Sequence, residues 1–212
     1  MGKVKRAYRS DLRARQAHET RRRVVAAAAR LFTESGYAGT TLAKIAAEAG
    51  VSPETVQSHG PKAALLRAAI ELAGFGVEGV DDSAQLDQWQ VALAAEEDEL
   101  PEVCGRILAR THAAMAGLIE ALVGGAGSDP ELRDYYADMV AGMRTHWRRM
   151  FDLLDSRGWL RDDQPLKQAA EGWSAIASPE THVRLVRDFG WSDRRYAAWI
   201  ATMMRTTVLR ER

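Results

Sequence analysis

Apolar residues recur along the chain every three or four positions, and no stretch shows the sustained alternation of a half-buried strand. The first apolar stripe, over residues 24–32, is followed by Gly36, which can end a helix. Shorter stripes follow over 42–49, 53–59 and 62–73. Ser52 followed by proline is a helix start, so the pattern predicts four short helices at the N-terminal end.

Longer amphipathic stretches make up the rest of the chain. Apolar residues share one face over 107–122, 136–154 and 196–207, with shorter helices expected over 166–177 and after Ser178. Residues 74–101 are acidic and interrupted by Gly79 and Pro101, so we expect a loose connection there, with one short helix around 85–97. The sequence therefore predicts an all-α protein of about nine helices, the first four separable from the others.

Composition places the chain among folded, soluble proteins. Its 212 residues are 46% hydrophobic and 27% charged, which excludes wholesale disorder and allows one large domain or two small ones. The single cysteine, Cys104, cannot form an internal disulfide and points to a reducing compartment. The longest apolar run, over 24–29, is far shorter than the ~20 residues that a membrane span needs. We expect a cytoplasmic protein with no membrane partner and no signal peptide.

The distribution of charged residues along the chain indicates what kind of partner the protein binds. The chain is neutral overall, with 29 basic and 29 acidic residues. Residues 1–30 nevertheless carry a net charge of +8, and residues 73–105 carry −9. Such asymmetry points to a charged partner. Neutrality therefore says nothing against binding to nucleic acid, and the acidic segment is expected to lie away from it.

The most informative stretch is residues 42–56. Two short predicted helices are joined there by a turn that contains Gly50, and Ser52 caps the second helix. That arrangement describes a helix-turn-helix, which lays its second helix in the DNA major groove. The other interpretation is an ordinary corner between two helices inside a helical domain.

Residues 20–72 resemble the DNA-binding domain of the TetR family of bacterial regulators. The residues that carry the resemblance are Ala28, Ala29, Leu31, Phe32, Glu34, Ser35, Gly36, Tyr37, Thr40, Thr41, Leu42, Ile45, Ala46, Ala49, Gly50, Val51, Ser52, Thr55, Val56, Lys62, Leu65 and Leu66. Residues 177–180 and 190–199 similarly resemble the last two helices of many family members. The resemblance implies a basic N-terminal arm over 1–19, a three-helix helix-turn-helix domain over 20–73, and a ligand-binding and dimerisation domain over 74–212.

The resemblance also assigns candidate DNA contacts. These are Arg21, Arg22, Arg23, Thr41, Ser52, Thr55, Gln57, Ser58, His59 and Lys62. Thr55 and Gln57 are the expected base-edge or backbone contacts, and Lys62 is expected at a phosphate. Alternatives remain for several of them: Thr41 can be an N-cap only, and His59 a turn residue. The arm either follows the DNA or is a solvated tail.

The sequence departs from the family between Gln57 and Lys62. Members usually have a tyrosine at the position of Gln57, a phenylalanine two residues further on, and a segment one residue longer. The tyrosine normally contacts phosphate, and the phenylalanine wedges the second helix against its neighbours. The departure leaves open where this helix ends, how far Lys62 reaches, and whether specific DNA binding is retained.

The C-terminal residues suggest an effector pocket and a dimer interface. Flexible and aromatic side chains are the expected pocket lining, namely Met115, Met139, Met143, Trp147 and Trp173. Apolar side chains of the last helices are expected at a homodimer interface, namely Val186, Trp199, Ile200, Met203 and Met204. Met and aromatic residues at helical spacing more often belong to an ordinary core, and part of the apolar surface of the last helices is expected there too. His112 and His146 are possible polar anchors, and no spacing suggests a metal site or a cofactor.

The function expected from these features is transcriptional regulation. A homodimer would bind a palindromic operator in double-stranded DNA, most simply as a repressor released by a small-molecule effector. The alternative keeps the fold but weakens or loses specific DNA binding, which leaves a ligand-binding or protein-interaction module. An enzyme ranks lowest, because no nucleophile and base pair, phosphate loop or paired carboxylates stand out.

Overall fold

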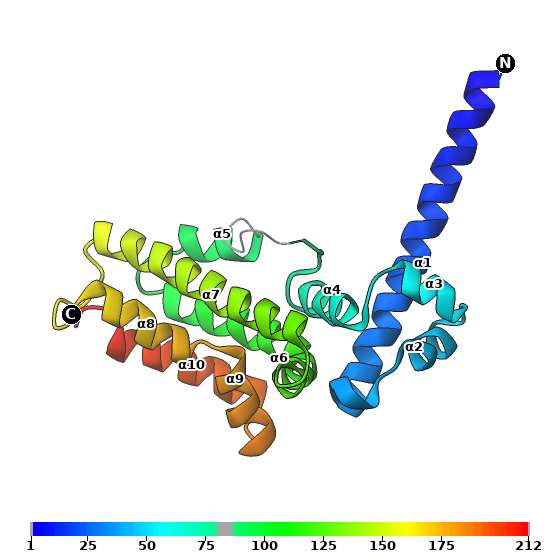
Figure 1. Cartoon of the computed structure of the whole chain (residues 1–212). Helices are drawn as coiled ribbons and strands as arrows, with labels where there is room; N and C mark the ends of the chain where they lie inside the picture. Colours follow the sequence, from blue (N-terminus) through cyan, green and yellow to red (C-terminus); the bar gives the residue numbers. More distant parts are fainter. Residues whose placement is uncertain (1, 80–86, 212) are drawn as a thin grey trace.

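The computed structural model describes residues 2–79 and 87–211, so residues 85 and 86 of the helix expected around 85–97 lie outside the described residues. Within the described ranges the secondary structure is helical, with ten α-helices and one π-helical turn. Figure 1 shows two parts, an N-terminal group built around the first helix and an elongated C-terminal bundle. The all-α prediction is confirmed.

The N-terminal group contains the four helices that the sequence predicts. They are α1 (Gly2–Gly39), α2 (Leu42–Ala49), α3 (Pro53–Ser58) and α4 (Lys62–Phe75). The α2–α3 turn forms because Gly50 adopts a left-handed conformation, with φ at +64°, and Ser52 accepts a hydrogen bond from the backbone N–H of Thr55. Helix α1 is kinked at Gly36, where φ is +66°.

Helix α1 begins much earlier than the sequence pattern suggests. Residues 2–19, expected as an arm ahead of the first helix, form its N-terminal half, which extends beyond α2 and α3 in Figure 1. The stretch between Gly2 and Gly36 contains neither glycine nor proline and is rich in Arg and Ala, which favour helix. The basic segment is thus part of the same helix that packs in the N-terminal group.

The C-terminal bundle contains the remaining helices. They are α5 (Asp87–Ala94), α6 (Leu100–Ala126), α7 (Pro130–Ser156), α8 (Leu166–Ile176), α9 (Pro179–His182), the π-helical turn η2 (Val183–Asp188) and α10 (Asp193–Thr207). Asp129, Ser178 and Ser192 cap α7, α9 and α10 through their side-chain oxygens. The helix expected after Ser178 has only four α-helical residues before it widens into η2.

Two hydrophobic cores stabilise the chain, and α6 contributes to both. The first joins Phe32, Ile45 and Leu66 of the N-terminal helices to the second half of α6, including Leu122. The first core therefore crosses the boundary predicted at residue 73. The second core lies between α6, α7, α8 and α10. Helix α6 is long and apolar enough to span a membrane, but most of its apolar stretch is buried between these helices, as in a soluble core.

Helix α10 packs against α6, which corrects part of the predicted dimer interface. Ile200 and Met204 are fully buried within the same chain, because they lie on the face of α10 that meets α6. They belong to the second core. Val186, Trp199 and Met203 are only partly buried and remain candidates for an interface.

Close contact between α6 and α10 depends on Gly105. A Cβ atom at this position would overlap the carbonyl oxygen of Ala197 in α10, whereas a Cβ at Gly124 of the same helix would meet open space. We expect Gly105→Ala to lower the free energy of unfolding by about 1–3 kcal/mol, because the helices must separate. Gly124→Ala is the control and should change it by at most about 1 kcal/mol, in the stabilising direction. Urea denaturation measures both, and equal effects would contradict the role of Gly105.

Candidate functional site: a nucleic-acid interface and a cavity

Helix α3 presents a polar face to solvent. Glu54, Gln57 and Ser58 are exposed, while Val56 on the opposite face is fully buried in the first core. The pKa of Glu54 is lowered by a backbone hydrogen bond at its own residue and by the Ser52 hydroxyl, so its carboxylate is ionised at the helix start. A short helix fixed by one buried residue, with polar side chains outward, is suited to contact a surface rich in hydrogen-bonding groups.

The segment that departs from the family ends α3 without an aromatic wedge. The backbone N–H groups of His59 and Gly60 donate to the carbonyls of Val56 and Gln57, at 3.0 and 3.1 Å. Arg21 of α1 donates from Nη1 to the carbonyl of His59 at 3.0 Å and forms an ion pair with Glu78. Backbone bonds and one arginine therefore position the end of α3, and the helix ends at Ser58.

Two further predicted DNA contacts, Lys62 and Arg23, bond backbone carbonyls of the protein. The Lys62 ammonium donates to the carbonyls of Tyr37 and Thr40, at 3.0 and 3.2 Å, and lies 3.8 Å from the centre of the Tyr37 ring. Arg23 donates to the carbonyls of Ala49 and Gly50 at the end of α2. Both cations hold helix ends together, with Lys62 partly buried and Arg23 exposed.

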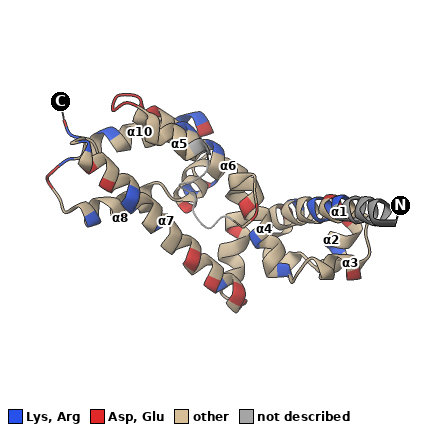
Figure 2. Cartoon of the chain, turned by 90° about the horizontal axis from the view of Figure 1, so that it is seen from above, with Lys and Arg blue, Asp and Glu red and all other residues tan. Residues whose placement is uncertain are grey.

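Other candidate contacts are exposed but also make local bonds. Thr41 accepts from the N–H of Lys44 as the cap of α2, and Ser58 donates to the carbonyl of Thr55 at 2.7 Å. Thr55 and His59 are partly buried, whereas Arg22 is exposed on α1. Figure 2 shows basic residues recurring along α1 beside α2 and α3. The structure thus places Arg22, Thr41, Ser52, Gln57 and Ser58 at the surface of this region.

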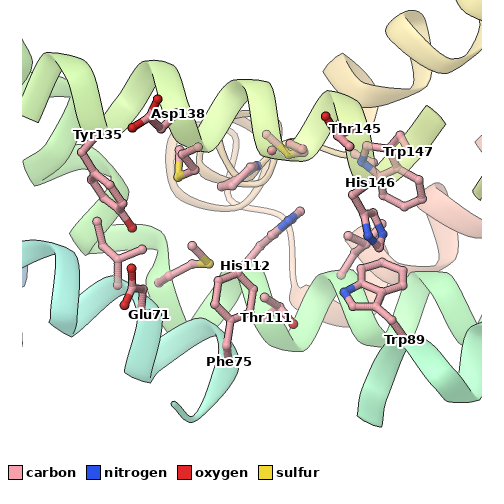
Figure 3. A pocket seen from close by; sticks show the side chains of 18 of the residues that line it. Glu71, Phe75, Trp89, Thr111, His112, Tyr135, Asp138, Thr145, His146 and Trp147 are labelled. Atoms are coloured by element: carbon pink, nitrogen blue, oxygen red, sulfur yellow. The ribbon is translucent and has the colours of Figure 1, made fainter. Parts of the chain in front are cut away.

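A cavity of about 460 Å³ lies where the two cores meet, between α4, α5, α6 and α7 (Figure 3). Four of the five predicted lining residues do line it: Met115, Met139, Met143 and Trp147. The exception is Trp173, which is buried behind Trp147 with ring centroids 5.7 Å apart, because α8 reaches the cavity wall only from outside. A volume of this size suits a drug-sized ligand.

Polar groups enter this cavity from three helices. Glu71 comes from α4, Thr111 and His112 from α6, and Tyr135 from α7 (Figure 3). His112 Nδ1 lies 3.1 Å from the Tyr196 hydroxyl. Burial, and secondarily the neighbouring His182, lowers the pKa of His112 to about 3, so the imidazole is neutral at physiological pH. The cavity therefore combines an apolar lining with a few fixed polar groups.

Residues 24–69 match the family model of the bacterial regulatory proteins of the tetR family. The N-terminal domain is a TetR-family domain. The match covers α2, α3 and the parts of α1 and α4 that pack on them. A search of curated proteins returns no match to the sequence.

Solved structures share this fold over nearly the whole chain. A protein of Saccharomonospora viridis described as a transcriptional regulator, in complex with choline, is 20% identical over 92% of this chain and 100% of its own, with a TM-score of 0.70. NalD of Pseudomonas aeruginosa, the secondary repressor of the MexAB-OprM multidrug efflux pump, is 19% identical over 93% of this chain and 100% of its own, with a TM-score of 0.69. A TetR transcriptional regulator of Chloroflexus aurantiacus J-10-FL is 23% identical over 93% of this chain and 100% of its own, with a TM-score of 0.66. At these identities the likeness establishes the fold.

Helix α4 also supplies cavity residues that the sequence pattern did not reveal. Arg67, Glu71 and Phe75 of α4 all line the cavity. Their spacing of four is typical of a helix face, and an arginine four residues before a glutamate usually indicates a solvated surface pair. Nothing in the sequence indicates that Glu71 is buried. That depends on how α4 packs against the distant helices α6 and α7.

The internal bonds of Lys62 generate a test within the TetR-family domain. We expect Lys62→Met to reduce the free energy of unfolding by about 1–3 kcal/mol, because the carbonyls of Tyr37 and Thr40 lose a charged donor. The dependence of DNA affinity on salt should remain unchanged, since this ammonium does not reach a phosphate. Chemical denaturation and DNA titrations at several salt concentrations measure the two effects. A salt slope lower by about one, with stability intact, would instead assign Lys62 to the DNA.

Proposed function

We propose that this chain is a DNA-binding transcriptional regulator, a cytoplasmic homodimer that represses transcription until a small-molecule effector releases it from a palindromic operator. The observation that carries the proposal is the exposed polar face of α3 in a TetR-family helix-turn-helix. NalD, of the same fold, is described as a repressor, and the regulator of Saccharomonospora viridis is bound to choline. These neighbours support repression and effector binding as the simplest reading of the fold.

Helix α3 is the proposed recognition helix. Gln57 is exposed near its end and can make two hydrogen bonds to the edge of adenine in the major groove. Thr55 provides a second contact to a base edge or the backbone, while Ser52, Ser58, His59 and Thr41 are placed for phosphate or sugar contacts. Arg22 is the proposed phosphate-binding cation of α1. Arg21, Arg23 and Lys62 act indirectly, by holding the helices that carry these contacts.

A homodimer gives these contacts their spacing. Two recognition helices related by a two-fold axis can enter successive major grooves about 34 Å apart. The proposed interface uses the partly buried Val186, Trp199 and Met203. Phe189 lies close to them in sequence and is 64% exposed, an unusual position for a large apolar side chain. An unpaired chain would leave this apolar surface in water.

Helix α4 links the cavity to the DNA-binding face in this proposal. Its last turns line the cavity, and Glu71 accepts a hydrogen bond from the backbone N–H of Gly79 at 2.7 Å. The neighbouring Glu78 pairs with Arg21, which in turn holds the carbonyl of His59 at the end of α3. A ligand that displaces α4 changes the position of α3, so it shifts the population away from the operator-binding form.

Selection of bound sequences from random duplex DNA tests the proposal directly. A palindromic consensus is expected, and Gln57→Ala should weaken binding to it about tenfold or more and relax preference at one base pair in each half-site. Gln164→Ala is the control, because Gln164 lies in the connection between α7 and α8 at the far end of the bundle. Weak binding without sequence preference would overturn the proposal and favour the alternative, a dimer of the same fold that lacks specific DNA binding.

Two neighbouring arginines separate direct from indirect contributions to DNA binding. Arg22→Ala should lower the slope of log affinity against log salt by about one, because one phosphate contact is lost. Arg21→Met should weaken operator binding by about three- to tenfold at unchanged slope, since it loosens the end of α3 without removing a phosphate contact. Titrations between low and physiological salt measure both slopes. A slope lowered by Arg21→Met would place this guanidinium on the DNA and contradict the internal role.

A further inference from the structure

The end of the cavity nearest α4 is acidic. The Glu71 side chain is only 8% exposed, and Asp138 of α7 lines the same end in Figure 3. Arg67, the cation paired with Glu71, has a side chain that is 53% exposed. A ligand inside the cavity therefore meets the buried carboxylate beside the half-exposed Arg67, which also lines the cavity.

The Arg67 guanidinium occupies a position that also suits the cationic group of a ligand. Its Nε donates to Glu71 Oε1 at 2.8 Å, and its guanidinium carbon lies 5.2 Å from the centre of the Tyr135 ring. A carboxylate beside the face of an aromatic ring attracts cations through both charge and the ring quadrupole. Figure 3 shows the Tyr135 hydroxyl directed toward Glu71, so both groups serve the same end of the cavity.

The remainder of the cavity suits an apolar body with one polar group. Met115, Met139, Met143, Trp89 and Trp147 supply polarisable and aromatic surface. Thr111 is nine-tenths buried and lines the cavity, and its Oγ1 has no hydrogen-bond partner within the described part of the chain. Buried hydroxyls normally have a partner, so Thr111 is placed to bond a ligand.

We infer that the effector is an organic cation, an amine or quaternary ammonium on an apolar or aromatic body, which competes with Arg67 for Glu71 and the Tyr135 ring. The inference rests on the proposed function, because it names the chemistry of the effector of the same site. The cation replaces the half-exposed guanidinium at the buried carboxylate, and the apolar body lies among the methionines and tryptophans. Thr111 selects ligands that carry a donor or acceptor near the middle of the cavity.

Competition at Glu71 has a structural consequence outside the cavity. Glu71 Oε2 holds the backbone N–H of Gly79, and Arg67 belongs to the same helix as Glu71. A ligand cation that draws the carboxylate inward strains the bond to Gly79 and, through Glu78, the contact between Arg21 and α3. The charge of the ligand is thereby linked to the position of the recognition helix.

Three probes of nearly equal shape test the charge requirement. Benzyltrimethylammonium is the cation, neopentylbenzene its neutral carbon analogue, and benzylsulfonate an anion of similar size. Binding is followed without DNA by fluorescence, because Trp89 and Trp147 line the cavity. We expect the cation to bind at least tenfold more tightly than either of the other two.

Two substitutions at the pair give opposite expected shifts. Glu71→Gln keeps an acceptor for Gly79 but removes the charge, so affinity for the cation should fall about ten- to a hundredfold. Arg67→Met removes the internal competitor, so affinity for the cation should rise about three- to tenfold. Glu171→Gln is the matched control, because Glu171 pairs with Arg144 outside the cavity and its loss should leave affinity unchanged.

Failure of this inference is distinguishable from failure of the proposed function. Equal binding of the three probes, preference for the anion, or no binding at all overturns the cationic effector and leaves operator binding intact. If Glu71→Gln does not fold, as judged by thermal melting, the comparison of the three probes on the unchanged protein still decides. A protein that binds the cation through Glu71 but no specific DNA would retain the ligand class and overturn the regulator.

Discussion

Burying the Glu71 carboxylate between α4, α6 and α7 requires that its charge be satisfied inside the protein. The two groups that satisfy it come from opposite sides, the Arg67 guanidinium at the cavity rim and the backbone N–H of Gly79 beyond the end of α4. Because one oxygen serves the cavity and the other serves the chain that follows α4, the carboxylate cannot move without affecting both. The bonds of Glu71 therefore connect the cavity to the chain that follows α4.

Internal bonding of charged groups also means that residues 1–30 present fewer free cations to a partner than their net charge of +8 suggests. Within residues 1–30, Arg21 bonds the carbonyl of His59 and the carboxylate of Glu78, and Arg23 bonds carbonyls at the end of α2. Lys62, outside that segment, bonds carbonyls in the same way. Helix ends leave carbonyls without partners, and a long cationic side chain satisfies them at a distance. At the end of α3, where the sequence has no phenylalanine or tyrosine, Arg21 makes this bond to the carbonyl of His59. The acidic connection contributes through Glu78, so part of its charge is bound within the chain.

Local signals in the sequence predicted the helices well, since caps and stops depend on neighbouring residues. Gly50 and Ser52 act as the sequence indicated, and the helix expected after Ser178 begins there. The sequence pattern does not reveal the early start of α1, because a run of basic residues suggests an arm, although nothing in it interrupts a helix. Four of the cavity methionines and aromatics were identified by type, but Trp173, Ile200 and Met204 were misplaced. Their faces are decided by helices distant in sequence, which periodicity alone does not specify.

The burial of Glu71 is likewise not visible in the sequence, because it depends on how the two hydrophobic cores pack around the cavity. Met115 and Met139 pack with the first core, whereas Trp147 and Met143 pack with the second. The cavity is the space that these cores leave between them, so its walls come from both. His112 extends this argument, because its ring faces the cavity while its Nδ1 contacts Tyr196 of α10. Helix α10 carries Trp199 and Met203 of the proposed interface. The cavity therefore borders groups that lead to α3 through α4 and to the proposed dimer interface through α10, so both routes of the proposed regulation start from the same lining residues.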